Sequence, residues 1–447
     1  MPTIHPSSFR IHPLSSPLNA TVRVPGSKSL TNRALLISAL ANGTTRITNA
    51  LFSDDSRYFA NALKTLDFDV QFDEANHEMT VTGLGGRIPA KKAELFIGNA
   101  GTAARFLSAF LALGHGEYIL DGDTRMRERP IGDLVYALGQ LGCDIQQLQK
   151  AEGGRQNGQI YPPIKITASG LKGGKTKIAG DISSQFLSAL LMVAPYAQTP
   201  IEIALTTALN SKPYVDMTIA IMRDFGVEVE REGYQYFKAP ITNYQLPISN
   251  SWTSLRASYP IESDASAASY FFAAPAICGG MVRVENISRK SVQGDINFLD
   301  VLAKMGCIVT EAENSITVHR PSSIVGIDVD MRDIPDTAQT LAAIAPFADS
   351  PTRIRGIASA RVKETDRVHA TCTELARLGV RVEEARDGMT IYPVEKMRPA
   401  LIQTYNDHRM AMAFSLIGLR FDGVTIENPS CVSKTFPNFF ETLDGLR

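Results

Sequence analysis

The chain has 447 residues, of which 44% are hydrophobic and 20% charged, and its formal net charge is −1. This length exceeds one ordinary hydrophobic core, so we expect an enzyme-sized globular protein with two domains. The balance of 45 Lys and Arg against 46 Asp and Glu gives no support for nucleic acid as a partner, and no apolar run is long enough to span a membrane.

The first predicted element is a strand over residues 9–14, where apolar and polar residue types alternate. The last copy of the repeat described below is cut short. Residues 439–443 have the pattern of the helix of that copy, and the chain then ends at Arg447. The N-terminal strand can supply the strand that this copy lacks. We therefore expect the N-terminal strand to complete the last unit, which places both termini in one domain.

Six polar boxes recur along the chain, and each leads into an apolar run with helical spacing. Ser, Thr, Asp and Asn before such a run are N-cap signals. A helix N-terminus carries partial positive charge and free N–H groups, so six of them brought together would attract anions. The boxes are Pro25–Ser29, Gly98–Thr102, Asp181–Gln185, Glu262–Ser266, Asp333–Thr337 and Tyr405–Arg409.

A second repeat runs in step with the boxes, and it consists of an amphipathic helix, a glycine and a short alternating strand. A glycine after the last apolar residue of a helix is typical of the left-handed turn that ends it. The copies lie roughly 75 residues apart, which is too long for a solenoid repeat. This spacing suits an α/β unit of the βαβαββ type used six times. The glycine position is taken by Asp67, Gly142, Gly226, Gly306 and Gly379.

The polar stretch Asn243–Tyr259 fits a return crossover between two domains, and its partner is expected near Pro25–Gly26. We predict one domain from residues 1–26 plus 262–447 and an inserted domain from residues 27–261. Because the boxes are split between the two, neither holds a full site, and we expect the active site in the cleft between them.

Basic residues gather near the boxes, and several converging cations suit a multiply anionic small molecule. Arg binds carboxylate and phosphate through two parallel hydrogen bonds, which Lys cannot do. A charge pair about 4 Å apart in a partly screened cleft is worth roughly 4 kcal/mol. No GxxxxGK[ST] loop exists and no GxGxxG follows a strand, so no nucleotide cofactor is indicated.

The five cysteines are scattered along the chain without paired spacing. We interpret them as small buried apolar residues in a reducing compartment, and not as members of disulfides or of a zinc site. No signal peptide is visible at the N-terminus. We therefore expect a cytoplasmic protein without a metal.

Eight stretches, in order along nearly the whole chain, resemble the 5-enolpyruvylshikimate-3-phosphate (EPSP) synthase family of enolpyruvyl transferases. The run Arg361–Arg367 followed by Asn406–Ala411 is highly specific for this family. The stretches are Pro25–Ser29, Gly98–Ala103, Glu128–Gly132, Ser183–Leu187, Ser211–Tyr214, Arg361–Arg367, Asn406–Ala411 and Lys434–Pro437.

The resemblance implies a two-domain inside-out α/β barrel of six βαβαββ units, three per domain, that closes over its substrates. It also implies 3-phosphoshikimate 1-carboxyvinyltransferase activity in the shikimate pathway, which leads to chorismate and the aromatic amino acids. In that reaction the enolpyruvyl group of phosphoenolpyruvate moves to the 5-hydroxyl of shikimate 3-phosphate, and phosphate is released. The implied partners are these two small molecules, and we expect a monomer with no cofactor.

By resemblance, shikimate 3-phosphate contacts hydroxyl, amide and charged side chains, which suit its hydroxyls and phosphate. This set is Lys28, Ser29, Arg33, Ser183, Ser184, Gln185, Ser211, Tyr214, Asp336, Ser359 and Lys363.

Phosphoenolpyruvate is implied to contact a second set, in which Arg and Lys hold its carboxylate and phosphate. This set is Lys28, Asn99, Gly101, Thr102, Arg129, Gln185, Arg367, Arg409 and Lys434.

Three residues are implied to be catalytic. The addition step needs a proton placed on the methylene carbon of phosphoenolpyruvate and a proton taken from the 5-hydroxyl. We expect Glu364, with Lys28, to relay the proton to carbon, and Asp336, at a helix start, to act as the base toward the hydroxyl.

Two residues depart from the family pattern. Ser359 stands where many relatives have Asn, and its hydroxyl reaches less far. Phe106 stands where many relatives have Pro, on the helix that bears Gly101. The herbicide glyphosate occupies the phosphoenolpyruvate site of sensitive members, and we expect reduced but not abolished sensitivity here. Alternatively, Phe106 packs into the core beside Leu107 and Phe110 with no effect on the site.

Two other functions remain open. UDP-N-acetylglucosamine enolpyruvyl transferase shares the fold and the chemistry. It carries Lys-Asn in place of Lys28-Ser29, however, and a Cys in a mobile loop whose counterpart here, residues 114–129, has none. A non-catalytic anion-binding protein would keep the helix-start boxes but need not keep the residues expected to transfer protons.

Overall fold

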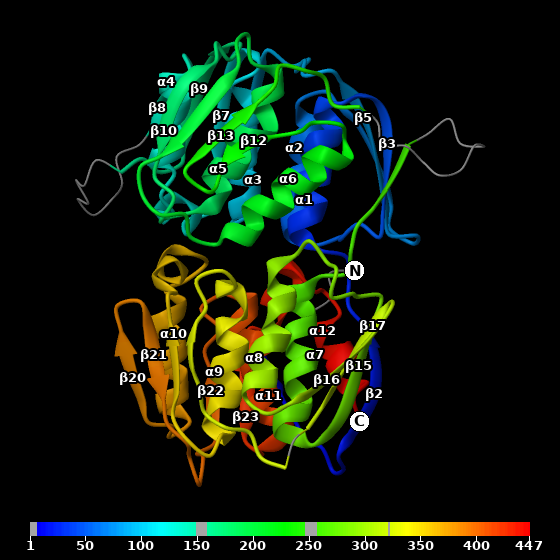
Figure 1. Ribbon diagram of the computed structural model, residues 1–447, viewed down its shortest axis with the longest axis vertical. Helices are drawn as coiled ribbons and strands as arrows, with labels where there is room; N and C mark the ends of the chain where they lie inside the picture. The colour runs from blue at the N-terminus through cyan, green and yellow to red at the C-terminus, as the bar shows by residue number, and fades with distance from the viewer. Residues whose placement is uncertain (1–6, 149–158, 246–256, 321) are drawn as a thin grey trace. The chain divides into compact units, whose positions relative to one another are not determined.

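The computed structural model describes residues 7–148, 159–245, 257–320 and 322–447 (Figure 1). The chain forms two compact units. The first, which we call the discontinuous unit, consists of residues 1–25 and 262–447, and the second, the inserted unit, of residues 26–261.

The inserted unit is built around helices α1 (Lys28–Leu40), α3 (Gly101–Leu111) and α5 (Ser184–Val193), which contact one another. Almost every residue of the three helices is buried. A helix that is apolar on all sides belongs inside a core, so these sequences place their N-terminal boxes at the ends of central helices. The remaining helices are α2 (Asp54–Thr65), η1 (Met126–Glu128), α4 (Gly132–Gln140), η2 (Ala194–Tyr196) and α6 (Lys212–Asp224).

Three four-stranded sheets cover these helices in the described part of the inserted unit. Each combines one parallel pair of strands with two antiparallel pairs. In sheet order, the strands are β14 (Ala257–Pro260), β3 (Asn42–Thr48), β5 (Glu78–Leu84) and β4 (Asp69–Asp73); β6 (Lys92–Phe96), β7 (His115–Asp121), β9 (Ile164–Ser169) and β8 (Asp144–Gln147); and β10 (Gly174–Ile178), β11 (Ile201–Leu205), β13 (Tyr236–Ala239) and β12 (Glu230–Glu232).

The discontinuous unit repeats this plan around α7 (Ala265–Cys278), α9 (Ala338–Ile344) and α11 (His408–Arg420), which also contact one another. Figure 1 shows these helices in the middle of the unit with strands at both edges. Its other helices are η3 (Gly294–Asn297), α8 (Phe298–Lys304), η4 (Pro335–Thr337), η5 (Ala345–Phe347), η6 (Ala358–Val362), α10 (Arg367–Arg377), η7 (Pro429–Lys434) and α12 (Phe439–Asp444).

Three sheets surround these helices as well, two with four strands and one with three, as far as this unit is described. In sheet order, the strands are β16 (Ile308–Ala312), β17 (Ser315–His319), β15 (Gly280–Glu285) and β2 (Leu18–Arg23); β18 (Asp328–Asp330), β19 (Thr352–Arg355), β21 (Gly388–Ile391) and β20 (Val382–Ala385); and β1 (Ser8–Arg10), β23 (Val424–Glu427) and β22 (Ala400–Ile402).

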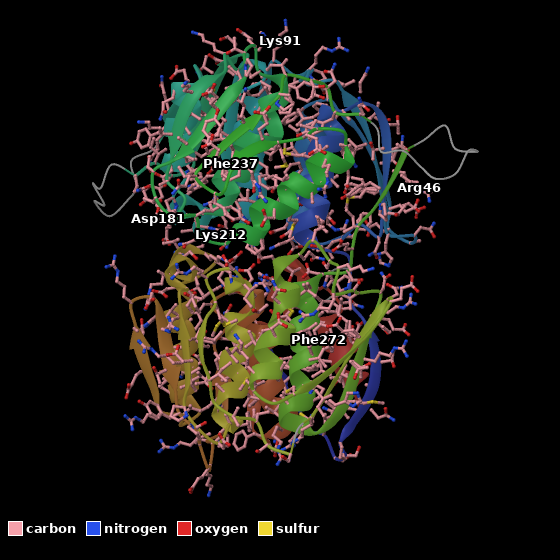
Figure 2. The ribbon with its side chains drawn as sticks, in the orientation of Figure 1. Arg46, Lys91, Asp181, Lys212, Phe237 and Phe272 are labelled. Carbon is pink, nitrogen blue, oxygen red and sulfur yellow. The ribbon has the colours of Figure 1, made fainter. Side chains whose placement is uncertain are left out.

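Large aromatic side chains fill the interior of each unit. Phe237 on β13 and Phe272 on α7, both labelled in Figure 2, are almost completely buried. The two-domain α/β fold with six small sheets agrees with the fold class predicted from the sequence.

The predicted helix–glycine–strand repeat is confirmed at all five expected turns of the described chain. Each turn residue has positive φ, from 66° at Asp67 to 99° at Gly306. The N–H of the next residue then donates to a carbonyl five residues earlier, as Val227 N does to Met222 O at 2.9 Å. Glycine adopts this left-handed conformation at little cost, which explains its recurrence at the helix ends.

The N-terminal strand pairs with the last strand of the chain, as predicted. β1 runs antiparallel to β23, with Phe9 opposite Ile426. The strand ends at Arg10, however, whereas residues 9–14 are predicted. Beyond Arg10 separate backbone bonds hold the chain, and Pro13 has no N–H for a ladder.

Four of the six boxes supply a side-chain N-cap, and two do not. Ser27, Ser183, Asp264 and Asp407 each accept a backbone N–H in the first turn of α1, α5, α7 and α11. Among the described residues, no side chain caps α3, which follows Ala100, and the fifth box forms the 3₁₀ turn η4 before α9 begins. The prediction of six capped helices is therefore wrong at these two boxes.

The predicted crossover Asn243–Tyr259 falls mostly on residues 246–256, which lie outside the described residues. Its described end forms β14, which runs parallel to β3, where a linker is predicted. The backbone N–H of Ile261 continues this pairing by donating to Thr48 O at 2.9 Å.

Candidate functional site

In the inserted unit, the expected residues gather at the starts of α1, α3, α5 and α6. Each of these helices contacts at least two of the others. Lys28 begins α1, and its Nζ lies 3.4 Å from Asp55 Oδ2 in the first turn of α2. The two side chains are only 12% and 3% exposed, so the ion pair is largely shielded from water.

Arg33 lies one turn further along α1 and joins it to α6. Its Nη1 donates to Ser29 O at 2.9 Å, its Nη2 to Tyr214 O at 3.1 Å and its Nε to Thr218 Oγ1 at 2.8 Å. The guanidinium lies over the ring of Phe106, 5.2 Å from the ring centroid. Burial lowers the pKa of Arg33 to about 10, so the group stays charged at neutral pH.

The loop before α3 holds Arg129 against its backbone. Arg129 Nη1 donates to Asn99 O at 3.1 Å and to Asn99 Oδ1 at 2.9 Å. A Cβ at Gly101 would lie 2.3 Å from Arg129 Nη2, so a glycine is needed for this approach. Gln185 Nε2 donates to Thr102 Oγ1 at 3.1 Å and thereby links the starts of α5 and α3.

The serine boxes present hydroxyls at the starts of α5 and α6. Ser183 Oγ accepts the N–H of Gln185 at 3.3 Å, and Ser184 follows as the first residue of α5. Ser211, just before α6, is buried and has φ of 58°, which is uncommon for a residue with a side chain. Tyr214 lies in the first turn of the same helix.

In the discontinuous unit, Asp336 on η4 lies among three cations. Its carboxylate contacts Lys363 Nζ at 2.5 Å, Arg409 Nη2 at 2.8 Å and Arg367 Nη1 at 3.1 Å. Burial by itself raises the pKa of Asp336, but the charges of Arg409, Lys363 and Arg367 hold that pKa well below its usual range. Asp336 is therefore a fixed anion at neutral pH.

Arg367, the first residue of α10, joins three carboxylates. Besides Asp336, it contacts Glu364 Oε2 through Nη2 and Asp407 Oδ2 through Nε, both at 2.7 Å. Burial lowers the pKa of Arg367, yet these carboxylates outweigh it and raise the pKa. Arg367 is 3% exposed and Asp407 is fully buried, so this part of the network is shielded from solvent.

Lys434 and Arg409 complete the cluster in the discontinuous unit. Lys434 Nζ lies 3.7 Å from Glu364 Oε1, and Arg409 Nη1 donates to Tyr270 OH at 3.4 Å. Burial raises the pKa of Tyr270 to about 12, so its hydroxyl stays neutral. Ser359 lies on η6, which contacts η4 and leads toward Lys363.

The named side chains of this cluster carry four positive charges against three negative ones. The four cations come from three different segments, around η6 and α10, at the start of α11 and at the end of η7. Together they can receive one further anion. The cations are Lys363, Arg367, Arg409 and Lys434, and the carboxylates are Asp336, Glu364 and Asp407.

Sequence reasoning missed two carboxylates that hold site cations. Asp407 lies in a predicted helix-start box and in the family stretch Asn406–Ala411, but neither pattern indicates its pairing with Arg367, which spans 40 residues. Asp55 lies in Ser53-Asp54-Asp55-Ser56, where Ser53 and Ser56 form a capping box at the start of α2. That pattern was visible in the sequence as a helix start.

Within the described residues, no group of three or more His, Cys, Asp and Glu side chains is arranged to hold a metal ion. The five cysteines, all of them described, are free thiols. None of the described helices is long and apolar enough to cross a membrane.

Comparison with known proteins identifies one family. Residues 14–443 match the family described as EPSP synthase (3-phosphoshikimate 1-carboxyvinyltransferase). The chain is 48% identical over 434 residues to the 3-phosphoshikimate 1-carboxyvinyltransferase of Trichormus variabilis, with 97% of both chains covered. It is 50% identical over 430 residues to the enzyme of that name from Sulfurovum sp., with 96% of this chain and 97% of the relative covered.

Solved structures give the same result. EPSP synthase from Acinetobacter baumannii superimposes with a TM-score of 0.75 and 27% sequence identity, covering 98% of this chain and 97% of that one. The enolpyruvyl transferase NikO from Streptomyces tendae has a TM-score of 0.75 over 98% of this chain and 97% of its own, at 17% identity, and is similar in fold.

Proposed function

The chain belongs to the EPSP synthase family, and we propose that the clusters described in its two units are the two halves of the active site. The enzyme transfers the enolpyruvyl group of phosphoenolpyruvate to the 5-hydroxyl of shikimate 3-phosphate, in the shikimate pathway. The observation that carries the proposal is the cation cluster around Asp336, with Arg367, Arg409 and Lys363 all within 3.1 Å of one carboxylate.

We propose that phosphoenolpyruvate binds where the cations of both units can reach its carboxylate and phosphate. Arginine forks suit these groups, and the N-termini of helices add free N–H donors. Arg129 is supported in this role by its place against the start of α3, which Gly101 permits. The proposed contacts are Lys28, Asn99, Gly101, Thr102, Arg129, Gln185, Arg367, Arg409 and Lys434.

Shikimate 3-phosphate is proposed to bind the hydroxyl-rich helix starts of the inserted unit together with Asp336 and its neighbours. Two properties of Arg33 support this set of contacts. It donates hydrogen bonds to the backbone carbonyls of Ser29 and Tyr214, and it keeps its charge. The proposed contacts are Lys28, Ser29, Arg33, Ser183, Ser184, Gln185, Ser211, Tyr214, Asp336, Ser359 and Lys363.

The chemistry needs three proton movements, one to C3, one from C3 and one from the 5-hydroxyl. A bond forms between the 5-hydroxyl oxygen and C2 of phosphoenolpyruvate, while a proton is added to C3. A proton then leaves C3, the bond from C2 to the phosphate oxygen breaks, and phosphate departs. We propose that Glu364 carries the proton at carbon, with Lys28 as its partner from the inserted unit.

Asp336 is proposed as the group that accepts the hydroxyl proton. Its low pKa keeps it ionised, so it accepts a hydrogen bond from the hydroxyl and takes the proton as the hydroxyl oxygen bonds to C2. The adjacent Lys363, whose pKa burial lowers, is placed to exchange a proton with the same carboxylate. Positioning and fixed charges supply much of the rate.

The remaining elements of the proposal are a monomer acting in the cytoplasm and glyphosate as an inhibitor at the phosphoenolpyruvate site. Five free thiols suit a reducing compartment. The buried Phe106, stacked on Arg33, supports an altered response to glyphosate because it lies on the helix that begins at Gly101.

A phosphate-release assay tests the reaction. We expect release only when shikimate 3-phosphate and phosphoenolpyruvate are both present, without added metal or nucleotide. Equal turnover with UDP-N-acetylglucosamine as acceptor would favour the related enolpyruvyl transferase. Absence of release with either acceptor, from protein that still binds phosphoenolpyruvate, would favour a non-catalytic anion-binding protein.

A further inference from the structure

A buried carboxylate lies two turns along α10 from Arg367, outside the cation cluster. Glu374 has no exposed side-chain surface. It accepts hydrogen bonds from the backbone N–H of Gln403 at 3.1 Å, from Tyr405 OH at 2.8 Å and from Arg377 Nε at 3.0 Å. A buried carboxylate is stable only when it is satisfied in this way, so α10 and the segment 403–405 are held together by one anion.

The segment that Glu374 holds is the connection from β22 to α11. Tyr405 and Asn406 both have φ of 54°, so two successive residues with side chains occupy the left-handed region. Asn tolerates this conformation, but Tyr rarely adopts it, and the surrounding contacts must compensate for the strain. The next residues are Asp407, which caps α11, and Arg409.

The same connection reaches η7. Asn428 Nδ2 donates to Asn406 Oδ1 at 3.2 Å, and Ser430 Oγ donates to Asn428 Oδ1 at 2.8 Å. Asn428 is itself left-handed, with φ of 46°, and it immediately precedes η7, the 3₁₀ segment that ends at Lys434. We call Glu374, Tyr405, Asn406 and Asn428 the polar frame.

The polar frame therefore connects the three elements that carry Arg367, Arg409 and Lys434. The bonds from Glu374 to Gln403 and Tyr405, and the bond between Asn406 and Asn428, run between elements, so they are not needed to form α10, α11 or η7 individually. Together with the pairs made by Asp336 and Asp407, they hold the relative placement of the three cations. Packing alone would leave the short polar connections free to shift, whereas hydrogen bonds to a buried carboxylate have fixed lengths and directions.

We propose that the polar frame is a set of positioning residues for phosphoenolpyruvate, acting through Arg367, Arg409 and Lys434. The proposal rests on the function proposed above. It assigns binding of one substrate to side chains that are not among the proposed contacts of either substrate.

The main test is Tyr405→Phe, which keeps the ring and removes only the hydroxyl that bonds to Glu374. We expect the KM for phosphoenolpyruvate to rise about tenfold, the scale of losing one hydrogen bond to a charged group. The KM for shikimate 3-phosphate and kcat should each stay within about twofold, because the lost bond acts on the cations of one substrate. The control is Arg381→Gln, which breaks an exposed ion pair with Glu383 just beyond α10 and should leave all three constants unchanged.

A second pair of variants tests the backbone conformation. Asn406→Gly loses the amide but accepts a positive φ, whereas Asn406→Ala loses the amide and is strained as well. We expect a larger rise in the KM for phosphoenolpyruvate in the alanine variant than in the glycine variant.

The outcomes separate this inference from the function on which it rests. A Tyr405→Phe enzyme with a lower Tm but an unchanged KM for phosphoenolpyruvate would show a purely structural role and overturn the inference alone. Equal rises in both KM values would also overturn it. A wild-type protein that releases no phosphate from the two substrates would overturn the proposed function and the inference with it.

Discussion

The two units hold their site arginines in different ways. In the inserted unit, Arg33 and Arg129 donate to backbone carbonyls: those of Ser29 and Tyr214, and that of Asn99. These carbonyl oxygens orient each guanidinium against the backbone at the helix starts.

In the discontinuous unit, the arginines are matched with carboxylates. Arg367 contacts three of them, and Arg409 shares Asp336 with it. The comparison teaches that the arginines of the inserted unit are oriented by carbonyl oxygens, whereas those of the discontinuous unit are matched with carboxylates. Substitutions in the two units should therefore have different effects.

The largest effect is expected for Asp407→Asn, which removes one charge from the paired half. Asn still caps a helix, so the change isolates the ion pair with Arg367. Removing one partner from a buried ion pair costs about 3–5 kcal/mol, and Asp336 and Glu364, which still contact Arg367, place the expected loss at the lower end of that range. Calorimetry should show a Tm loss confined to the transition of the discontinuous unit.

Asp444→Asn is the matched control, because it breaks an exposed pair with Arg447 in the same unit. Surface pairs contribute about 0–1 kcal/mol, so its Tm should barely move. Equal losses of Tm in Asp407→Asn and Asp444→Asn would mean that the buried carboxylates of the discontinuous unit do not compensate its arginines. The contrast drawn between the two units would then be wrong.

Glu364→Gln comes next, since it keeps the shape of the side chain but cannot carry a proton. We expect kcat to fall by about 10²-fold or more, with modest changes in substrate binding, because the lost interaction belongs to the transition state. Steady-state kinetics measure this directly, with the exposed Glu383→Gln as control. A near-normal kcat in Glu364→Gln would mean that Glu364 only orients Arg367 and Lys434.

Gly101→Ala sharpens the comparison from the inserted unit. The new Cβ would lie 2.3 Å from Arg129 Nη2, so the guanidinium has to move away from the start of α3. The clashing atom is the far end of a flexible side chain, so we expect the protein to stay folded while the KM for phosphoenolpyruvate rises about tenfold, or about 1.4 kcal/mol.

Gly139→Ala on α4 is the control for Gly101→Ala, because its Cβ meets nothing within 4 Å. It should leave KM unchanged and stabilise the helix slightly. An unchanged KM in Gly101→Ala as well would indicate that Arg129 takes no part in substrate binding.

The smallest effect concerns Phe106, which replaces the proline of many relatives. Its ring is buried under Arg33, so it links α3 to the helix that carries Ser29. Phe106→Pro removes that contact and a helical N–H. We expect the wild type to be a few-fold less sensitive to glyphosate than the proline variant, as measured by inhibition at matched phosphoenolpyruvate relative to KM. If Phe106→Pro is no more sensitive to glyphosate than the wild type, this position does not affect the site.

Local patterns predicted local structure well. The left-handed turns at Gly142 and its counterparts, and the caps at Ser27 and Asp407, follow from residue types within one or two helical turns. The boxes before α3 and η4 were mispredicted because Ala100 has no capping oxygen, and because Pro335 favours a tight first turn.

The cation-bearing segments were predicted from the basic residues near the boxes and from the family resemblance, and the structure brings Lys363, Arg367 and Arg409 together around Asp336. What the sequence could not reveal is which carboxylate each cation meets. Lys28 and Asp55 lie 27 residues apart, and Arg367 and Asp407 lie 40 apart, on helices whose mutual placement depends on the whole core. Periodicity indicates which face of a helix is buried, but not which helix faces it.

The pairing of β1 with β23 has a consequence for synthesis on the ribosome. Residues 26–261 are contiguous, so the inserted unit can fold as soon as they have emerged. Thr425, the partner of Arg10, is made 415 residues after it. At about 5–20 residues per second this takes roughly 20–80 s, during which the edge of the first strand has no partner. Correct folding of the nascent chain therefore requires that the first strand pairs with no other strand until the last sheet is complete.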